Sequence, residues 1–187
     1  MIAPLRIDER VNLPLRERYY AAQDFGAMLA SAQKNPELWA AVAKRAIVPD
    51  TFVARVRALG GSWHLLVLSA DWCGDAVNIV PVIARLADLA PNLDLRIVDR
   101  DQNLDLMDVH LTGTSRSIPV FIALDENFVE RGWWGPRPAE LQRWTIGDGK
   151  SLEKTERYRQ VRTWYARDRG MTSLGELVAM LELAARS

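Results

Sequence analysis

The first third of the chain has a pattern of apolar residues that predicts short helices. These residues recur at steps of three and four: Leu15, Tyr19, Ala22, Phe25, Gly26 and Leu29, then Leu38, Trp39, Val42 and Ala46, then Phe52, Val53, Val56 and Leu59. Pro36 and Pro49 restart the pattern, and Gly60-Gly61 ends it. Because about 60 residues of short helices bury little surface alone, we expect residues 1–61 to form a helical N-terminal extension packed on a core.

Residues 62–146 have a different pattern, which predicts an α/β core. Strands are expected at 64–69, 93–97, 120–124 and 128–133, and helices at 74–90 and 104–111. The first strand, helix and second strand form a βαβ unit, whose strands are parallel, whereas the last strand returns antiparallel to the third. Pro81 predicts a kink in the first of these helices. Residues 147–187 return to helical spacing, so we expect C-terminal helices packed on this core.

The charge balance limits the classes of partner. The 187 residues include 24 Lys and Arg and 24 Asp and Glu, so the formal charge is zero, which argues against a general nucleic-acid binder. No apolar run approaches the roughly 20 residues of a membrane span. Met1–Tyr20 mixes Arg6, Asp8, Glu9 and Arg10 with single apolar residues, unlike a signal peptide. We therefore expect a cytoplasmic protein with neither nucleic-acid nor membrane partners, and the sequence defines no oligomeric state.

Cys73 is the candidate reactive group. It is the one cysteine of the chain, which excludes an internal disulfide and a multi-cysteine metal site. It lies where a strand ends and a helix begins, so the helix dipole and the first free N–H groups favour its thiolate. A lone cysteine is more often a small buried hydrophobe, but this placement favours an accessible, functional thiol. Asp71 and Asp75 oppose the thiolate, which leaves the direction of its pKa shift open.

Other titratable residues form no recognisable motif. The aspartates at 99, 101, 105 and 108 offer oxygen ligands, but they lack the EF-hand spacing and its central glycine, so we expect a solvated turn and helix start. His64 and His110 show no pattern that links them to Cys73, which argues against a Cys/His hydrolase. We therefore predict no metal and no organic cofactor.

A group of motifs extends from residue 70 to residue 138. It consists of Ala70-Asp71-Trp72-Cys73-Gly74, Pro81 eight residues after the cysteine, Asp99-Arg100-Asp101-Gln102-Asn103, Ile118-Pro119, and Trp134-Gly135-Pro136-Arg137-Pro138. With these motifs, residues 62–146 resemble thioredoxin-fold proteins, and the Trp-Cys-Gly-Asp variant resembles a bacterial subgroup of the thioredoxin family. The resemblance implies a thioredoxin-like fold with helical N- and C-terminal extensions.

The resemblance also implies roles for particular residues. Cys73 matches the attacking cysteine, and Pro119 matches the cis-proline that lies against it and orients a substrate backbone. The expected substrate contacts around these two catalytic residues are Trp72, Gly74, Asp75 and Ile118. Spacing alone does not show that the Ile118-Pro119 bond is cis, since most X-Pro bonds are trans.

Three departures from the family pattern bear on activity. Ala76 occupies the position of the resolving cysteine, whose thiol releases the product from a mixed disulfide. Val67 occupies the position of the buried acid that assists proton transfer, and Asp75 replaces the commoner proline. Ordinary dithiol turnover is therefore not expected of this chain.

Two classes of function remain open. In the first, Cys73 is a monothiol redox centre for a protein or small-molecule thiol or disulfide, and an external thiol such as glutathione resolves the mixed disulfide. In the second, the chain is a catalytically impaired binding module that uses the groove near Pro119 or an aromatic patch of Trp133, Trp134 and Trp144. Because neighbours on a strand face opposite sides, at least one of Trp133 and Trp134 is expected to pack inward.

Overall fold

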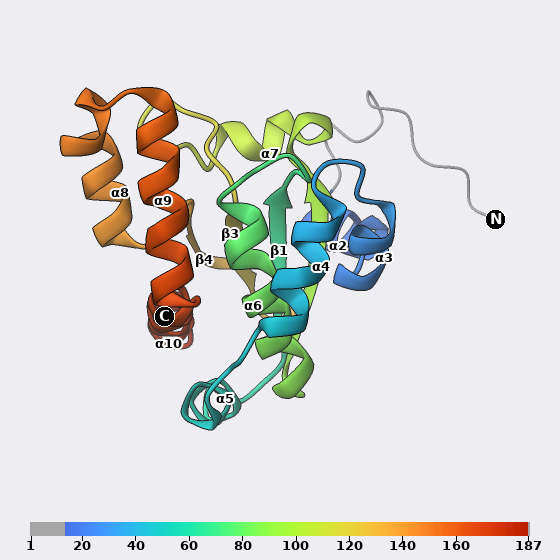
Figure 1. The fold of residues 1–187 in the computed structure, drawn as a ribbon. Coiled ribbons are helices and arrows are strands. Elements are labelled where there is room, and N and C mark those ends of the chain that lie inside the picture. The colour runs from blue at the N-terminus through green and yellow to red at the C-terminus, as the bar shows by residue number, and fades with distance from the viewer. Residues whose placement is uncertain (1–13, 187) are drawn as a thin grey trace.

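A four-stranded mixed sheet forms the centre of the computed structural model, which describes residues 14–186 (Figure 1). Its strands are β1 (Trp63–Ser69), β2 (Leu93–Asp99), β3 (Val120–Leu124) and β4 (Glu130–Trp134), in the order β2-β1-β3-β4. β1 is parallel to β2 and antiparallel to β3, and β3 is antiparallel to β4. The predicted α/β class, the parallel βαβ pair and the antiparallel return are confirmed.

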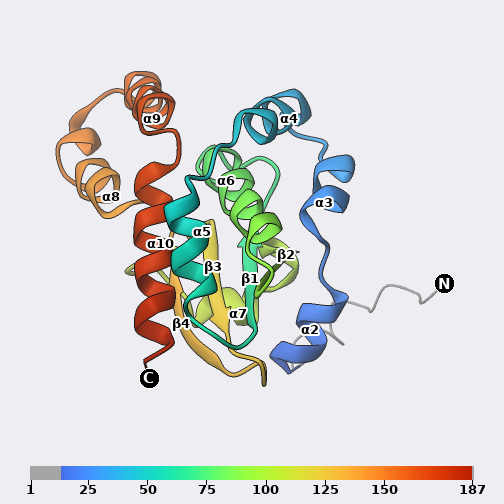
Figure 2. The ribbon, with the colours of Figure 1, turned by 90° about the horizontal axis from the view of Figure 1, so that it is seen from below.

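Helices lie on both sides of this sheet. In the described residues they are α2 (Leu15–Ala21), α3 (Phe25–Ser31), α4 (Pro36–Arg45), α5 (Asp50–Arg57), α6 (Ala76–Leu89), α7 (Leu104–Asp108), α8 (Ala139–Ile146), α9 (Lys154–Asp168) and α10 (Met171–Ala184), with 3-10 turns η1 (Arg100–Gln102) and η2 (Asp148–Ser151). α4 packs on α6, and α10 packs on β4 and α5. The N-terminal helices α2–α4 lie toward the β2 edge of the sheet, and the C-terminal helices α8–α10 lie toward the β4 edge (Figures 1 and 2).

The core lies between the sheet and α6. Leu65, Leu66, Val67 and Leu68 of β1 are all fully buried, as the continuous apolar run predicts for a strand covered on both faces. α6 contributes a buried apolar stripe and runs through Pro81 as one helix. Within residues 14–186, no helix has the length and apolar character that crossing a bilayer requires. Residues 1–13, where most of the segment assessed for a signal peptide lies, are outside the described residues.

Two local differences from the sequence pattern have clear causes. The first apolar pattern is split between α2 and α3, because Gln23 is extended and exchanges two backbone hydrogen bonds with Ile97 of β2, at 2.7 and 3.1 Å. Asp24 then starts α3 by accepting a hydrogen bond from the Ala27 amide. β4 begins at Glu130 rather than at residue 128, because Phe128 has a φ of 62°, which no strand residue adopts.

Candidate functional site

Cys73 lies in the loop between β1 and α6. Its thiol donates a hydrogen bond to the Ile118 carbonyl oxygen at 3.3 Å, and its sulfur accepts one from the Ala76 amide at 3.4 Å. The Ala76 amide belongs to the first residue of α6, so the sulfur lies at the N-terminal end of this helix, where the dipole is positive. The structure therefore brings Cys73 together with the Ile118-Pro119 peptide, as the family resemblance implies.

The sulfur is less accessible than the sequence pattern indicates. Cys73 is only 7% exposed, so the expectation of an accessible thiol is wrong. Burial raises the pKa of the Cys73 thiol above its ordinary value, and Asp75 adds to this rise, whereas the Ala76 amide and the Arg137 guanidinium act against it. The sequence left the direction of this pKa shift open. Burial makes it a rise, because a thiolate loses its hydration inside the protein. At neutral pH the thiol is therefore the dominant form.

The remaining predicted site residues differ in exposure. Trp72 is 47% exposed and Gly74 is also exposed, whereas Asp75, Ile118 and Pro119 are buried. Of these residues, Trp72 and Gly74 are therefore the ones that reach the surface beside Cys73 in the chain.

Pro119 is covered by the loop that follows β4. The Ile118-Pro119 and Gly135-Pro136 bonds are both cis. Gly135 packs so closely on Pro119 that a Cβ atom at residue 135 would lie 2.2 Å from the Pro119 carbonyl oxygen. The loop after β4 thus contacts the Pro119-Val120 peptide, which follows the Ile118-Pro119 peptide that accepts from the thiol, and only a residue without a side chain fits there.

The N-terminal helices hold the start of the Cys73 loop. The Asp71 carboxylate accepts hydrogen bonds from the backbone amides of Gln33 and Lys34, at 2.8 and 2.9 Å. The indole of the fully buried Trp39 in α4 donates to the Asp71 carbonyl oxygen at 2.9 Å. Trp39 appeared in the sequence as one residue of a helical stripe, which gave no signal of its contact with the loop.

The C-terminal part of the chain holds the other end of the loop. Arg137 binds both oxygens of the Asp75 carboxylate, at 2.9 Å through Nε and 2.6 Å through its terminal nitrogen. The hydroxyl of Tyr165, in α9, donates to the same carboxylate at 2.8 Å. Neither Arg137 nor Tyr165 was a predicted site residue, although Arg137 lies in the motif at residues 134–138.

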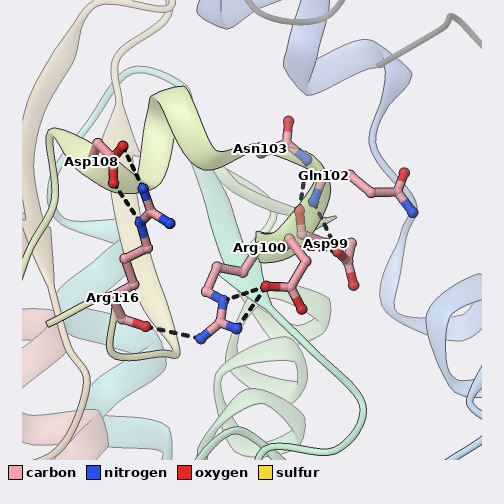
Figure 3. Close-up of polar contacts among 7 residues, drawn as sticks. Asp99, Arg100, Gln102, Asn103, Asp108 and Arg116 are labelled. Atoms are coloured by element: carbon pink, nitrogen blue, oxygen red, sulfur yellow. Dashed lines mark hydrogen bonds and ion pairs between the residues drawn. The ribbon is translucent and has the colours of Figure 1, made fainter. Parts of the chain in front are cut away.

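A series of charged residues connects the Trp72 ring to the segment before Pro119. The Arg100 guanidinium lies 4.8 Å from the centre of the Trp72 ring and also pairs with Asp101 at 2.6 Å. Arg100 further donates to the Arg116 carbonyl oxygen, and Arg116 pairs with Asp108, as Figure 3 shows. The exposed indole is therefore tied to the segment that precedes Pro119.

The acidic stretch after β2 is occupied by intramolecular partners. Asp99 accepts hydrogen bonds from the amides of η1 (Figure 3), and Asp105 pairs with Arg18 at 2.6 Å. Among the described residues, no group of three His, Cys, Asp or Glu side chains is placed to hold a metal ion. Asp99 therefore fixes the turn η1, and Asp105 ties α7 to α2.

The tryptophan patch is partly covered. Trp133, Trp134 and Trp144 are each half-buried and pack against the core. Trp134 tilts against Phe121, and its indole nitrogen donates to Glu176 of α10 at 3.0 Å. Trp134 is therefore held between β3 and α10, and part of each of the three rings remains exposed.

Comparison with known proteins shows similarities of sequence family and of fold. A family model described as Thioredoxin matches residues 22–159. The chain belongs to the thioredoxin family. The match extends into both helical flanks, beyond the 62–146 stretch that carries the sequence motifs of this thioredoxin-family protein. No curated protein matches the sequence at a significant level.

Two crystal structures share the fold of this thioredoxin-family chain. One is a protein of unknown function from Pseudomonas aeruginosa, with a TM-score of 0.74 and 20% identity over 91% of this chain and 98% of the other. The second is an HIV epitope scaffold, with a TM-score of 0.70 and 19% identity over 89% of this chain and 96% of the other. At these identities the similarity is one of fold, and it includes the flanking helices.

Proposed function

We propose that this thioredoxin-family protein carries out thiol–disulfide exchange through Cys73 as a single thiol. The observation that carries the proposal is the position of the sulfur, at the first amide of α6 and 3.3 Å from the Ile118 carbonyl oxygen. A helix N-terminus stabilises a thiolate, and the adjoining Ile118-Pro119 peptide provides a backbone against which a substrate chain aligns. The substrate is a protein or small-molecule disulfide.

The reaction has two exchanges. The Cys73 thiolate attacks one sulfur of a disulfide, a mixed disulfide forms at Cys73, and the other sulfur leaves as a thiolate that takes a proton from water. Ala76 supplies no second thiol, so a small external thiol attacks the mixed disulfide and returns Cys73 to the thiol form. The substrate disulfide is thereby converted into a disulfide that contains the external thiol. Cys73 ends in the same oxidation state in which it began. A reducing cytoplasm, where small thiols are abundant, suits this proposal.

The alternative function is a binding module that retains the fold without turnover. Two observations favour it: the 7% exposure of Cys73 and the raised pKa of its thiol. A partner would then dock over Trp72, which is exposed and directly precedes Cys73 in the chain. The two functions differ in whether a covalent bond to Cys73 forms.

Mixed-disulfide formation tests the proposal directly. We expect the protein to gain one glutathione on incubation with glutathione disulfide, more rapidly as the pH rises, and to lose it on addition of free thiol. Mass spectrometry reads the adduct without ambiguity, because Cys73 is the sole cysteine. The Cys73→Ser variant is the control and gains nothing. Absence of an adduct at every pH, in folded protein, would favour the binding module.

A second experiment restores the missing thiol. Ala76→Cys is expected to raise turnover in an insulin-disulfide reduction assay from near background, because a second thiol at this position can release the mixed disulfide. The chain as it stands is expected to remain near background with a dithiol reductant. Equal inactivity of both proteins would count against a redox role.

A further inference from the structure

Asp75, Arg137 and Tyr165 form a polar cluster behind the Cys73 loop. The three residues come from the start of α6, the loop after β4 and α9, so they are distant in the sequence. All polar atoms of the Asp75 carboxylate are engaged: one oxygen accepts from Arg137 Nε and the Tyr165 hydroxyl, and the second pairs with the other guanidinium nitrogen. Gln142 accepts a further hydrogen bond from Arg137 at 3.0 Å.

The cluster is largely removed from water. Tyr165 is 4% exposed and Asp75 is 9% exposed, and the Arg137 side chain is mostly covered. Charges in such an environment act on their neighbours more strongly than charges at the surface. Two charges of the cluster act on Cys73: the Asp75 carboxylate raises the pKa of its thiol, whereas the Arg137 guanidinium lowers it. The Asp71 carboxylate, two residues before Cys73 in the chain, accepts hydrogen bonds from the amides of residues 33 and 34.

We propose that Arg137 and Tyr165 are positioning residues for Cys73, which hold the Asp75 carboxylate in a closed ion pair and thereby set the rate at which the thiol reacts. This inference rests on the proposed function and adds its regulation, because Tyr165 gives helix α9 an influence on the sulfur through the Asp75 carboxylate. A partner that displaced α9 would leave Asp75 with Arg137 alone and make the thiol less reactive.

The electrostatic role is separable from a structural one by two variants that break the same ion pair. Asp75→Asn leaves the Arg137 cation near the sulfur, so the thiolate is favoured and Cys73 reacts more rapidly. Arg137→Gln leaves the Asp75 anion, so the thiolate is disfavoured and Cys73 reacts more slowly. One pKa unit changes the thiolate fraction about tenfold below the pKa, and we expect each variant to change the rate by at least about threefold. A pair that merely braced the loop would give changes in the same direction.

The assay is alkylation of Cys73 by iodoacetamide across a pH series, followed by mass spectrometry on folded protein. Arg137→Lys keeps the cation and is expected to retain most of the reactivity that Arg137→Gln loses. Tyr165→Phe removes one donor to Asp75 and is expected to slow the reaction, whereas Tyr158→Phe, at an exposed position of the same helix, leaves it unchanged. The double variant Asp75→Asn/Arg137→Gln is expected to fall between the two single variants.

The possible results are distinct. Opposite shifts of the pH–rate profile for Asp75→Asn and Arg137→Gln support the inference. Equal profiles for all variants, or shifts of the same sign, overturn it. Alkylation reports thiol reactivity whether or not disulfides are substrates. If the ordering holds while the wild-type chain forms no mixed disulfide with glutathione, the proposed function fails and the control of Cys73 by the cluster stands.

Discussion

Gly135→Ala is the substitution whose effect is best defined by the structure. Gly135 has a φ of 144°, where a residue with a side chain pays about 1–3 kcal/mol. The added Cβ would lie 2.2 Å from the Pro119 carbonyl oxygen and 3.2 Å from the Val120 Cα. Both neighbours are backbone atoms, so relief requires movement of β3 or of the loop after β4, and overpacking of this kind costs about 1–3 kcal/mol more. We expect a total destabilisation of about 2–6 kcal/mol.

Urea unfolding, followed by tryptophan fluorescence, measures this loss as a lower midpoint at an unchanged slope. Gly175→Ala is the matched control: Gly175 lies inside α10, its added Cβ would meet nothing within 4 Å, and its φ is not positive. There the same methyl group is expected to stabilise the protein by about 0.5–1 kcal/mol, because alanine favours a helix over glycine. A loss below about 1 kcal/mol for Gly135→Ala would refute the argument from close contact.

Two further predictions concern buried polar groups. Trp39→Phe leaves the Asp71 carbonyl oxygen without its indole donor and is expected to lower the free energy of unfolding by about 1–3 kcal/mol in urea titrations; an unchanged midpoint would contradict it. Burial opposes the charge on His110, but hydrogen bonds to Glu130 and to the Leu106 carbonyl outweigh it and raise its pKa above 6.5. The folded state therefore holds this proton more tightly, and the stabilisation is complete below the unfolded-state pKa and is lost as the pH rises through the folded-state pKa. Urea midpoints between about pH 5.5 and pH 8.5 should show this decline in the wild type and not in His110→Gln; parallel curves would refute it.

Elements could be predicted wherever apolar spacing was regular. The strand at 120–124 was predicted to the residue, and the parallel pairing of β1 with β2 followed from the length of the intervening helix. The break at Gln23 could not be predicted, because it depends on pairing with Ile97, which is 74 positions away in the chain. Spacing reports which face of a segment is apolar, and it does not report which distant segment covers that face.

The candidate site was predicted only in part, because some of its contacts come from segments that are distant in the chain. Cys73 and Pro119 were found from short motifs, and the structure places the Cys73 thiol on the peptide that includes Pro119. The burial of the sulfur could not be predicted, because it results from long-range packing around the loop. The partners of Asp75 were also missed, since Tyr165 lies 90 positions from Asp75 in the chain, in a segment for which the sequence predicted helices alone.

The attachment of the Cys73 loop at both ends has a practical consequence for protein engineering. A fragment trimmed to residues 62–146 would discard the amides at 33 and 34 and Trp39, which hold Asp71, and Tyr165, which is one of the two partners of the Asp75 carboxylate. Such a fragment would be a poor reagent for studying the thiol, however well its sheet survived. Conversely, a tag or fusion inserted near residue 33 or into α9 would disturb groups that hold the Cys73 loop without touching the sulfur itself.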